Sequence, residues 1–369
     1  FRQGHLHCPY FGFILRFFLW MHGVFVCAGV NAKSPKWINV IVCFLQRVGF
    51  FTIFLSTFLA GGNTGVAIAL FFVSFAIYSA SAGMSNPLFA QMVGTSIHRN
   101  VGTFYGAYNM VGSVAGVAAS LILTRCLAAF SFPVSFRVVF LLGLVSALVA
   151  TAVVSVGVRE VTDDRVVEHI RLRDIFPIGV QILRENRPFR NYTLIKVLVG
   201  AAEFAVPYYI IAASSLKGTP AGFVGVMTTV YLVAKVVSSL VLGRIADRFG
   251  AIRLLRCSCI CGGAAALMVI LVRDWRLALV MYALLAVAVN GVMMSNNIAC
   301  VAYSGNVRTP IYAAASGLLC APLYVVSSFA GAAIVGRFSY TAVFLIAMAV
   351  YAACALLTFT LKDAKEGGR

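Results

Sequence analysis

The chain has 369 residues, of which 61% are hydrophobic and 11% are charged, and its mean hydropathy is +0.95. Soluble domains carry roughly 25% charged residues, so this composition excludes a soluble globular protein and indicates one that crosses a membrane many times. The net charge of +18 would suggest a nucleic-acid partner in a soluble chain. In a membrane protein basic cytoplasmic loops account for it, and we expect no nucleic acid.

Five apolar segments precede residue 158, and each is long enough to cross a hydrocarbon core, which takes roughly 20 helical residues. They lie at 10–30, 37–59, 65–94, a segment that opens at Gly102, and 137–157. The fourth segment carries small residues at spacings that allow helix backbones to touch inside a membrane. These small residues are Gly106, Gly112, Ala115, Gly116 and Ala119.

The polar segment Arg159–Arg190 mixes acids and bases, and it predicts a cytoplasmic linker at 158–193 with short amphipathic helices on the membrane surface. Six further apolar segments lie at 194–213, 222–242, 254–272, 277–303, 310–335 and 340–361. The prediction is an all-α polytopic membrane protein. Its helices would form an N-terminal group in 1–157 and a C-terminal group in 194–369 that ends in a short cytoplasmic tail.

The segment Gly243–Arg256 is a short basic stretch between two of these spans, and it predicts a tight charged turn. Glycine suits a turn in which φ is positive or backbones approach closely, and arginine suits a surface of anionic headgroups. Asp247 is the one acid in this stretch. It could cap the next helix or pair with a neighbouring arginine, and so hold sliding helices together. The alternative is an ordinary cytoplasmic loop.

Basic residues in the loops indicate the orientation of the chain. The loops that share a face with Gly243–Arg256 hold most of the loop arginines and lysines. This distribution predicts that this face and the C-terminus are cytoplasmic. We expect an integral protein of the plasma (inner) membrane.

The basic segment also carries the spaced pattern G-x-x-x-D-R-x-G-x-x-R. Its defined positions are Gly243, Asp247, Arg248, Gly250 and Arg253. This pattern resembles the loop signature of the major facilitator superfamily of transporters, which lies between the second and third helices of each six-helix half. The resemblance implies a gating role for the loop and two helical bundles around a central solute cavity. About 11 of the family's 12 helices would be present, with 10–30 as the second.

Ionisable residues inside membrane spans cost roughly 2.5–3.5 kcal/mol each at a helix centre, and they mark candidate functional positions. Glu203 is the one acid inside any predicted span. At about 1.5 Å per residue, it lies at the depth of Lys235 in the next, antiparallel span. Other polar residues reach a similar depth, namely Arg47, Asn109, Asn290, Asn296 and Asn297. The family resemblance implies that the solute binds near this level.

Together with these residues, the family resemblance implies a secondary active transporter of a small solute that works by alternating access. A carboxyl group removed from water favours its neutral form, so Glu203 could bind and release a proton in each cycle. The alternatives are a static ion pair between Glu203 and Lys235, and a facilitative uniporter. Arg47 could bind an anionic or polar solute, and the asparagines could instead bridge helices.

Two further features concern the span that contains Glu203. Pro207 predicts a bend beside the acid, and Tyr208 could line the cavity there or serve only in packing. Lys196 lies near the predicted start of this span, so we expect its ammonium group to reach the membrane surface.

Nothing in the sequence indicates an enzyme or a cofactor. It contains neither the phosphate-binding pattern G-x-x-x-x-G-K-[ST] nor the zinc-binding pattern H-E-x-x-H. We expect a monomer whose partners are a small solute, protons and the lipid bilayer, and both uptake and efflux stay open. A non-transporting receptor of the same family, or an incomplete gene product, is the alternative, because the sequence does not begin with methionine.

Overall fold

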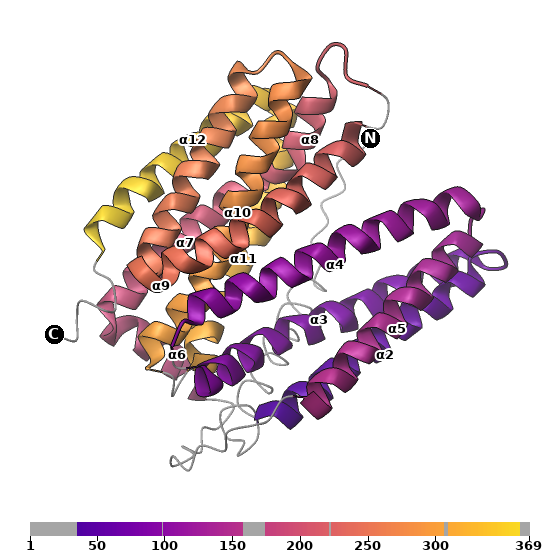
Figure 1. The fold of residues 1–369 in the computed structure, drawn as a ribbon, viewed down its shortest axis with the longest axis horizontal. Coiled ribbons are helices and arrows are strands. Elements are labelled where there is room, and N and C mark those ends of the chain that lie inside the picture. Colours follow the sequence, from indigo (N-terminus) through magenta and orange to yellow (C-terminus); the bar gives the residue numbers. More distant parts are fainter. Residues whose placement is uncertain (1–34, 98, 158–173, 221–222, 306–308, 362–369) are drawn as a thin grey trace. The chain divides into compact units, whose positions relative to one another are not determined.

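The structure is a computed structural model of the chain (Figure 1). It describes residues 35–97, 99–157, 174–220, 223–305 and 309–361. Within these ranges all regular structure is helical. The α-helices are α2 (Pro35–Leu59), α3 (Thr64–Ser96), α4 (Val101–Ala129), α5 (Val134–Gly157), α6 (Ile175–Glu185), α7 (Arg187–Ala202), α8 (Val206–Ser214), α9 (Phe223–Leu271), α10 (Trp275–Ser304), α11 (Thr309–Arg337) and α12 (Tyr340–Leu357). The 3₁₀ turns are η2 (Glu203–Ala205) and η3 (Thr358–Thr360). The predicted span at 10–30 lies outside the described residues.

Among the described residues, 8 helical segments are long and apolar enough to cross a membrane. One of them runs from Arg187 to Ser214 through α7, η2 and α8. Another is α9, whose 49 residues are enough for two crossings. Helices satisfy their backbone hydrogen bonds internally, as the interior of a bilayer requires. The predicted class, an all-α polytopic membrane protein, is confirmed.

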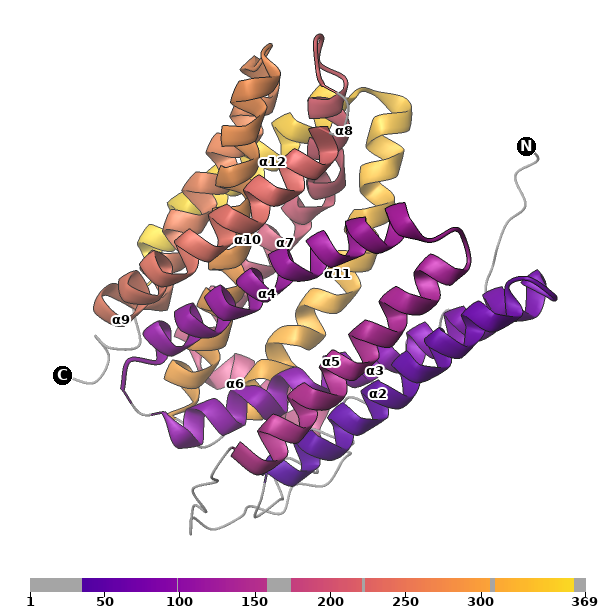
Figure 2. The same ribbon diagram turned by 45° about the vertical axis from the view of Figure 1, so that its right-hand side comes forward.

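The described residues belong to two compact units. The first comprises Phe1–Ser96, Leu123–Val180 and Val307–Ala314. Within it α2 packs against α3 and α5, and Figures 1 and 2 show these three helices side by side. Buried Val42 of α2 belongs to one core cluster with Met84 and Leu88 of α3. Many large apolar side chains on these helices are exposed, as expected of helices that face lipid.

The second unit comprises Ile97–Ile122, Gln181–Asn306 and Ala315–Arg369. Within it α9 packs against α10 and α12, and α12 also packs against α7. Some polar contacts inside this unit are made by buried hydroxyl groups. The hydroxyls of Tyr192 and Ser295 lie 2.7 Å apart, and Ser295 donates to the carbonyl oxygen of Ala251 at 2.8 Å. This chain of hydrogen bonds joins α7, α10 and the second half of α9.

Three of the boundaries between the two units fall inside helices, namely α4, α6 and α11. The predicted bundles at 1–157 and 194–369, joined by a linker at 158–193, stay predictions. Part of that linker is helical, because α6 and the first turns of α7 lie in it. The sequence suggested only short helical pieces there.

A single glycine changes the direction of α9. Gly250 has φ 88° and ψ 172°, and the chain is helical on both sides of it. This backbone region is open essentially to glycine alone. The prediction of a turn across the whole of Gly243–Arg256 is therefore wrong in its extent. One glycine redirects the chain, and the flanking residues, rich in arginine, leucine and alanine, are good helix formers.

Replacing Gly250 with alanine is expected to destabilise the protein by about 1–3 kcal/mol, because an added Cβ atom is strained at this φ. Thermal unfolding of the purified protein in detergent measures the effect. Gly263→Ala is a matched control in the same helix, since its Cβ would lie 3.6 Å from the Cβ of Tyr351, an ordinary contact. Equal unfolding temperatures for the two variants would contradict the strain argument.

Candidate functional site

Asp247 of α9 caps a different helix, α4. Its Oδ1 accepts a hydrogen bond from the backbone N–H of Gly102 at 2.6 Å. Its Oδ2 accepts from the backbone N–H of Thr103 at 2.7 Å and from the Thr103 hydroxyl at 2.5 Å. The first N–H groups of a helix have no partner within it and carry a partial positive charge. A carboxylate placed there therefore accepts hydrogen bonds from the free N–H groups of α4 and balances the partial positive charge at its N-terminus.

Glycines allow this contact by bringing the two backbones together. A Cβ added to Gly102 would lie 2.5 Å from the carbonyl oxygen of Gly243, and one added to Gly243 would lie 2.6 Å from that of Gly102. One turn further along α4, a Cβ on Gly106 would lie 2.6 Å from the carbonyl oxygen of Ser239. The predicted close approach at Gly106 is confirmed. The same prediction is wrong for Gly112, where an added Cβ meets nothing within 4 Å.

The arginines of the signature contact an aromatic ring, and Arg256, which follows the signature, contacts a second helix end. The guanidinium carbons of Arg248 and Arg253 lie 5.2 and 5.4 Å from the ring centroid of Phe249, within cation–π range. Arg256 donates to the hydroxyl and the carbonyl oxygen of Thr358, at 3.0 and 2.9 Å, where α12 ends. A cation at a helix C-terminus complements the partial negative charge there.

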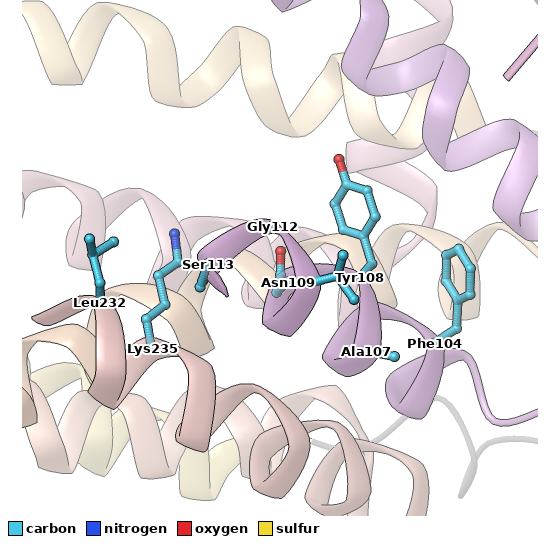
Figure 3. Close-up of a pocket in the computed structure, with 9 residues that line it drawn as sticks. Phe104, Ala107, Tyr108, Asn109, Gly112, Ser113, Leu232 and Lys235 are labelled. Atoms are coloured by element: carbon cyan, nitrogen blue, oxygen red, sulfur yellow. The ribbon is translucent and has the colours of Figure 1, made fainter. Parts of the chain in front are cut away.

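Lys235 and Asn109 share one open groove within the second unit. The groove has a volume of about 660 Å³ and is formed by α4 and α9. Figure 3 shows the side chains of Asn109, Tyr108 and Lys235 extending toward the same open space. None of the described residues that line it is acidic. The sequence placed Asn109 and Lys235 at one depth, and the fold puts them in one cavity.

Asn290 holds the helix that carries Lys235. Its side-chain amide donates to the carbonyl oxygen of Lys235 at 3.5 Å, to the Ser238 hydroxyl at 3.3 Å and to the Ser239 hydroxyl at 2.9 Å. The residue is buried, with 1% of its surface exposed. Its side chain therefore bridges α9 and α10, as the alternative for the asparagines expected.

Glu203 lies where the span formed by α7 and α8 is interrupted. It closes α7 and opens the 3₁₀ turn η2, and Pro207 follows at the start of α8. The helix changes from α to 3₁₀ hydrogen bonding at Glu203, and the bend expected from Pro207 stays a prediction. Within the described part of the chain, the Glu203 carboxylate makes no ion pair with Lys235, and the cation in electrostatic range of it is Lys196.

Lys196 is buried, with 8% of its surface exposed. The expectation that its ammonium group reaches the membrane surface is therefore wrong. Its ammonium group donates to the Ser316 hydroxyl at 3.1 Å, and Ser316 donates to the side-chain oxygen of Asn296 at 2.9 Å. The expectation failed because α7 begins at Arg187 rather than at 194, after an N-cap by Asn186. Lys196 therefore lies about two and a half turns inside the helix.

The remaining predicted site residues are not among those that line this groove. Arg47, in the first unit, donates from Nε to the carbonyl oxygen of Ala147 at 3.1 Å and so joins α2 to α5. The Tyr208 ring packs against the ring of Tyr340, with centroids 6.0 Å apart. Asn297 is half-buried on α10 and makes no hydrogen bond with another described side chain. The structure thus gives Arg47 and Tyr208 packing contacts.

Sequence reasoning missed two features of this region. The partner of Asp247 is 145 residues away in the sequence, and no local pattern identifies it. The second feature is the hydrogen bond from Lys196 to Ser316. A lysine inside an apolar stretch indicates a buried polar contact, but Lys196 was predicted to lie at the start of its helix and so was expected at the membrane surface.

The apolar spans define the class of polytopic helical membrane proteins. Residues 192–369 match the family model of the Major Facilitator Superfamily, while no curated protein matches the sequence. The C-terminal part of the chain is therefore similar to the major facilitator superfamily. This family consists of transporters rather than enzymes.

Solved structures support the fold. The transporter FucP, a fucose:proton symporter of E. coli, was solved in the outward conformation. It has 14% identity and a TM-score of 0.69, covering 97% of this chain and 91% of FucP. The human organic anion transporter MFSD10 has 13% identity and a TM-score of 0.65, over 94% and 83%. The proton:xylose symporter XylE has 12% identity and a TM-score of 0.61, over 95% and 85%. At these identities the likeness concerns the fold.

Replacing Asp247 with asparagine is expected to loosen the N-terminus of α4, because the amide loses the negative charge and one acceptor oxygen. Loss of such a cap costs about 1–2 kcal/mol. Hydrogen exchange of the peptide that contains Gly102 and Thr103 should become roughly tenfold faster. Asp274→Asn is the control, since Asp274 caps only its own helix through the backbone N–H of Arg276 at 2.9 Å. Unchanged exchange at Gly102 and Thr103 in the Asp247 variant would show that this cap carries little energy.

Proposed function

We propose that the protein is a secondary active transporter that moves a small solute by alternating access and is coupled to protons through Glu203. The observation that carries this proposal is the position of Glu203 at the break in a membrane span, with no ion pair to Lys235. An ionisable side chain inside a span is a functional candidate by default, because its cost must be balanced by a use. Two proteins of similar fold, FucP and XylE, are proton symporters.

The surroundings of Glu203 suit a group that changes its charge. Lys196 is the cation in electrostatic range of it, and the Lys196 ammonium is held in place by Ser316. A proton arriving at Glu203 would therefore change the net charge of this cluster while the lysine stays fixed. The 3₁₀ turn η2 lies at the same point of the chain, and such turns inside long helices often act as hinges. Protonation and bending would thus be linked at one position.

Alternating access also needs contacts that form in one state and break in another. The cap that Asp247 places on α4 is a suitable contact, because it consists of three hydrogen bonds between two helices. The glycines at this contact have no side chains that interlock, so the two helices can separate without side-chain rearrangement. We assign Asp247, Gly243 and Gly250 to the gate of the transporter, with Arg248 and Arg253 stabilising the loop through Phe249.

A facilitative uniporter is the second candidate. It is favoured by Lys196, which could neutralise Glu203 permanently if the acid never takes up a proton. For either transporter, the distribution of basic loop residues supports a plasma-membrane protein with a cytoplasmic C-terminus. A monomer is sufficient for this mechanism.

Glu203→Gln is expected to abolish solute accumulation driven by a pH gradient in proteoliposomes and to retain solute exchange, because glutamine keeps the size of the side chain but cannot titrate. Uptake of neutral, anionic and cationic solutes should be compared with and without the gradient. Glu185→Gln is the control, since Glu185 lies at the end of α6 and accepts a hydrogen bond from Gln181 at 2.7 Å.

Proton-driven accumulation by Glu203→Gln at the wild-type level would contradict the coupling role and favour the uniporter. If neither wild type nor variant moved any solute of the panel, a non-transporting receptor would become the better account.

A further inference from the structure

The groove formed by α4 and α9 contains a cation, Lys235, that has no partner among the described residues. Lys235 lies on its wall, and Figure 3 shows its ammonium nitrogen directed into the open space. Among the residues that the structure describes, none forms a hydrogen bond or an ion pair with this ammonium group. The described lining also contains no aspartate or glutamate. The groove therefore presents one uncompensated positive charge to whatever enters it.

The backbone that carries this charge is firmly held. The carbonyl oxygen of Lys235 accepts hydrogen bonds from the hydroxyls of Ser238 and Ser239, at 3.2 and 2.6 Å, and from the amide of Asn290. Ser239 and Asn290 are buried. The ammonium group is thus presented from a fixed point of the helix, and preorganisation of this kind favours a ligand over a loosely bound counterion.

The rest of the lining is apolar and aromatic with a few polar groups. On α4 the rings of Phe104 and Tyr108 stack at 6.5 Å with an interplanar angle of 18°. Leu232 lies one turn before Lys235 on α9, and Asn109 and Ser113 supply an amide and a hydroxyl. The volume of about 660 Å³ falls in the range of roughly 300–1,000 Å³ typical of small-molecule sites.

These parts are arranged along one axis. Residues 104–113 of α4 cover about 13 Å at 1.5 Å per residue. Figure 3 shows Lys235 near Ser113 and Gly112, and Phe104 toward the other end. One end of the groove is therefore polar and cationic, and the other is aromatic.

We propose that this groove binds an amphipathic organic anion, with its anionic group at Lys235 and an aromatic or apolar body along Tyr108 and Phe104. A single lysine acts as a compact point charge with three rotatable donors, which is sufficient to bind a monoanion such as a carboxylate. The groove disfavours amphipathic cations, because they would meet Lys235 without a balancing acid. This inference names the substrate class of the proposed transporter, and as a statement about transport it rests on that proposal.

Binding to the purified full-length protein tests the inference separately from transport. The probes are radiolabelled benzoate and benzamide, which have nearly the same shape and differ in charge. Wild type should bind benzoate roughly tenfold more tightly than benzamide. Lys235→Gln should remove this preference, and Lys235→Arg, which keeps the charge, should retain it. Lys217→Gln is the control, because Lys217 is an exposed lysine outside the groove.

The outcomes separate the two proposals. Absence of benzoate binding, equal binding of benzamide, or full benzoate binding by a folded Lys235→Gln protein would each overturn the anion site. Lys235-dependent benzoate binding in a protein that transports no solute would leave the site standing and overturn the transport function. Proton-driven transport of neutral solutes that does not depend on Lys235 would support the transport function and overturn the anion as its substrate class. The unfolding temperature of Lys235→Gln, compared with that of Lys235→Arg, shows whether a loss of binding reflects misfolding.

Discussion

In hydrocarbon there is no water to satisfy a polar group, and this constraint organises the structure. Each helix satisfies its interior backbone groups, but its ends remain open. In the second unit two of these ends are satisfied by side chains of α9. Asp247 binds the first N–H groups of α4, and Arg256 binds the last carbonyl of the α12 region. Each of these caps is also a tertiary contact, because it fixes one helix against another.

The same constraint separates the polar side chains into two kinds. Lys196 and Asn290 are buried and hydrogen-bonded, so they contribute to packing between helices. Glu203 and Lys235 make no ion pair with each other, although their depth along the chain allowed one. Depth is one coordinate, and pairing also depends on which faces of two helices meet. Their separation leaves one acid at a helix break and one cation in a groove, which is the arrangement on which both proposals depend.

The sequence was sufficient for the class, the approximate spans and the candidate polar residues, because these follow from composition and length. It was insufficient wherever a helix boundary or a partner mattered. Lys196 was misplaced since Asn186 and Pro188 start α7 early, a capping signal outside the apolar stretch that was used to set the span. Gly243–Arg256 was predicted to be a turn because charged residues occur both in loops and in the surface turns of helices, so their presence does not distinguish the two. Asp247 was recognised as a possible cap, but its partner Thr103 carries no signal of its own.

Gly250 explains how one short segment serves two helix ends of opposite charge. Asp247 lies three residues before it and Arg256 six residues after it, so the change of direction separates the acid from the base. A continuous straight helix would place both on one rod, about 13 Å apart along its axis. The glycine instead allows the acid to meet a helix N-terminus and the base to meet a helix C-terminus, each of which prefers that charge. Of the residues that make this arrangement, Asp247 and Gly250 belong to the signature, and Arg256 lies just after it.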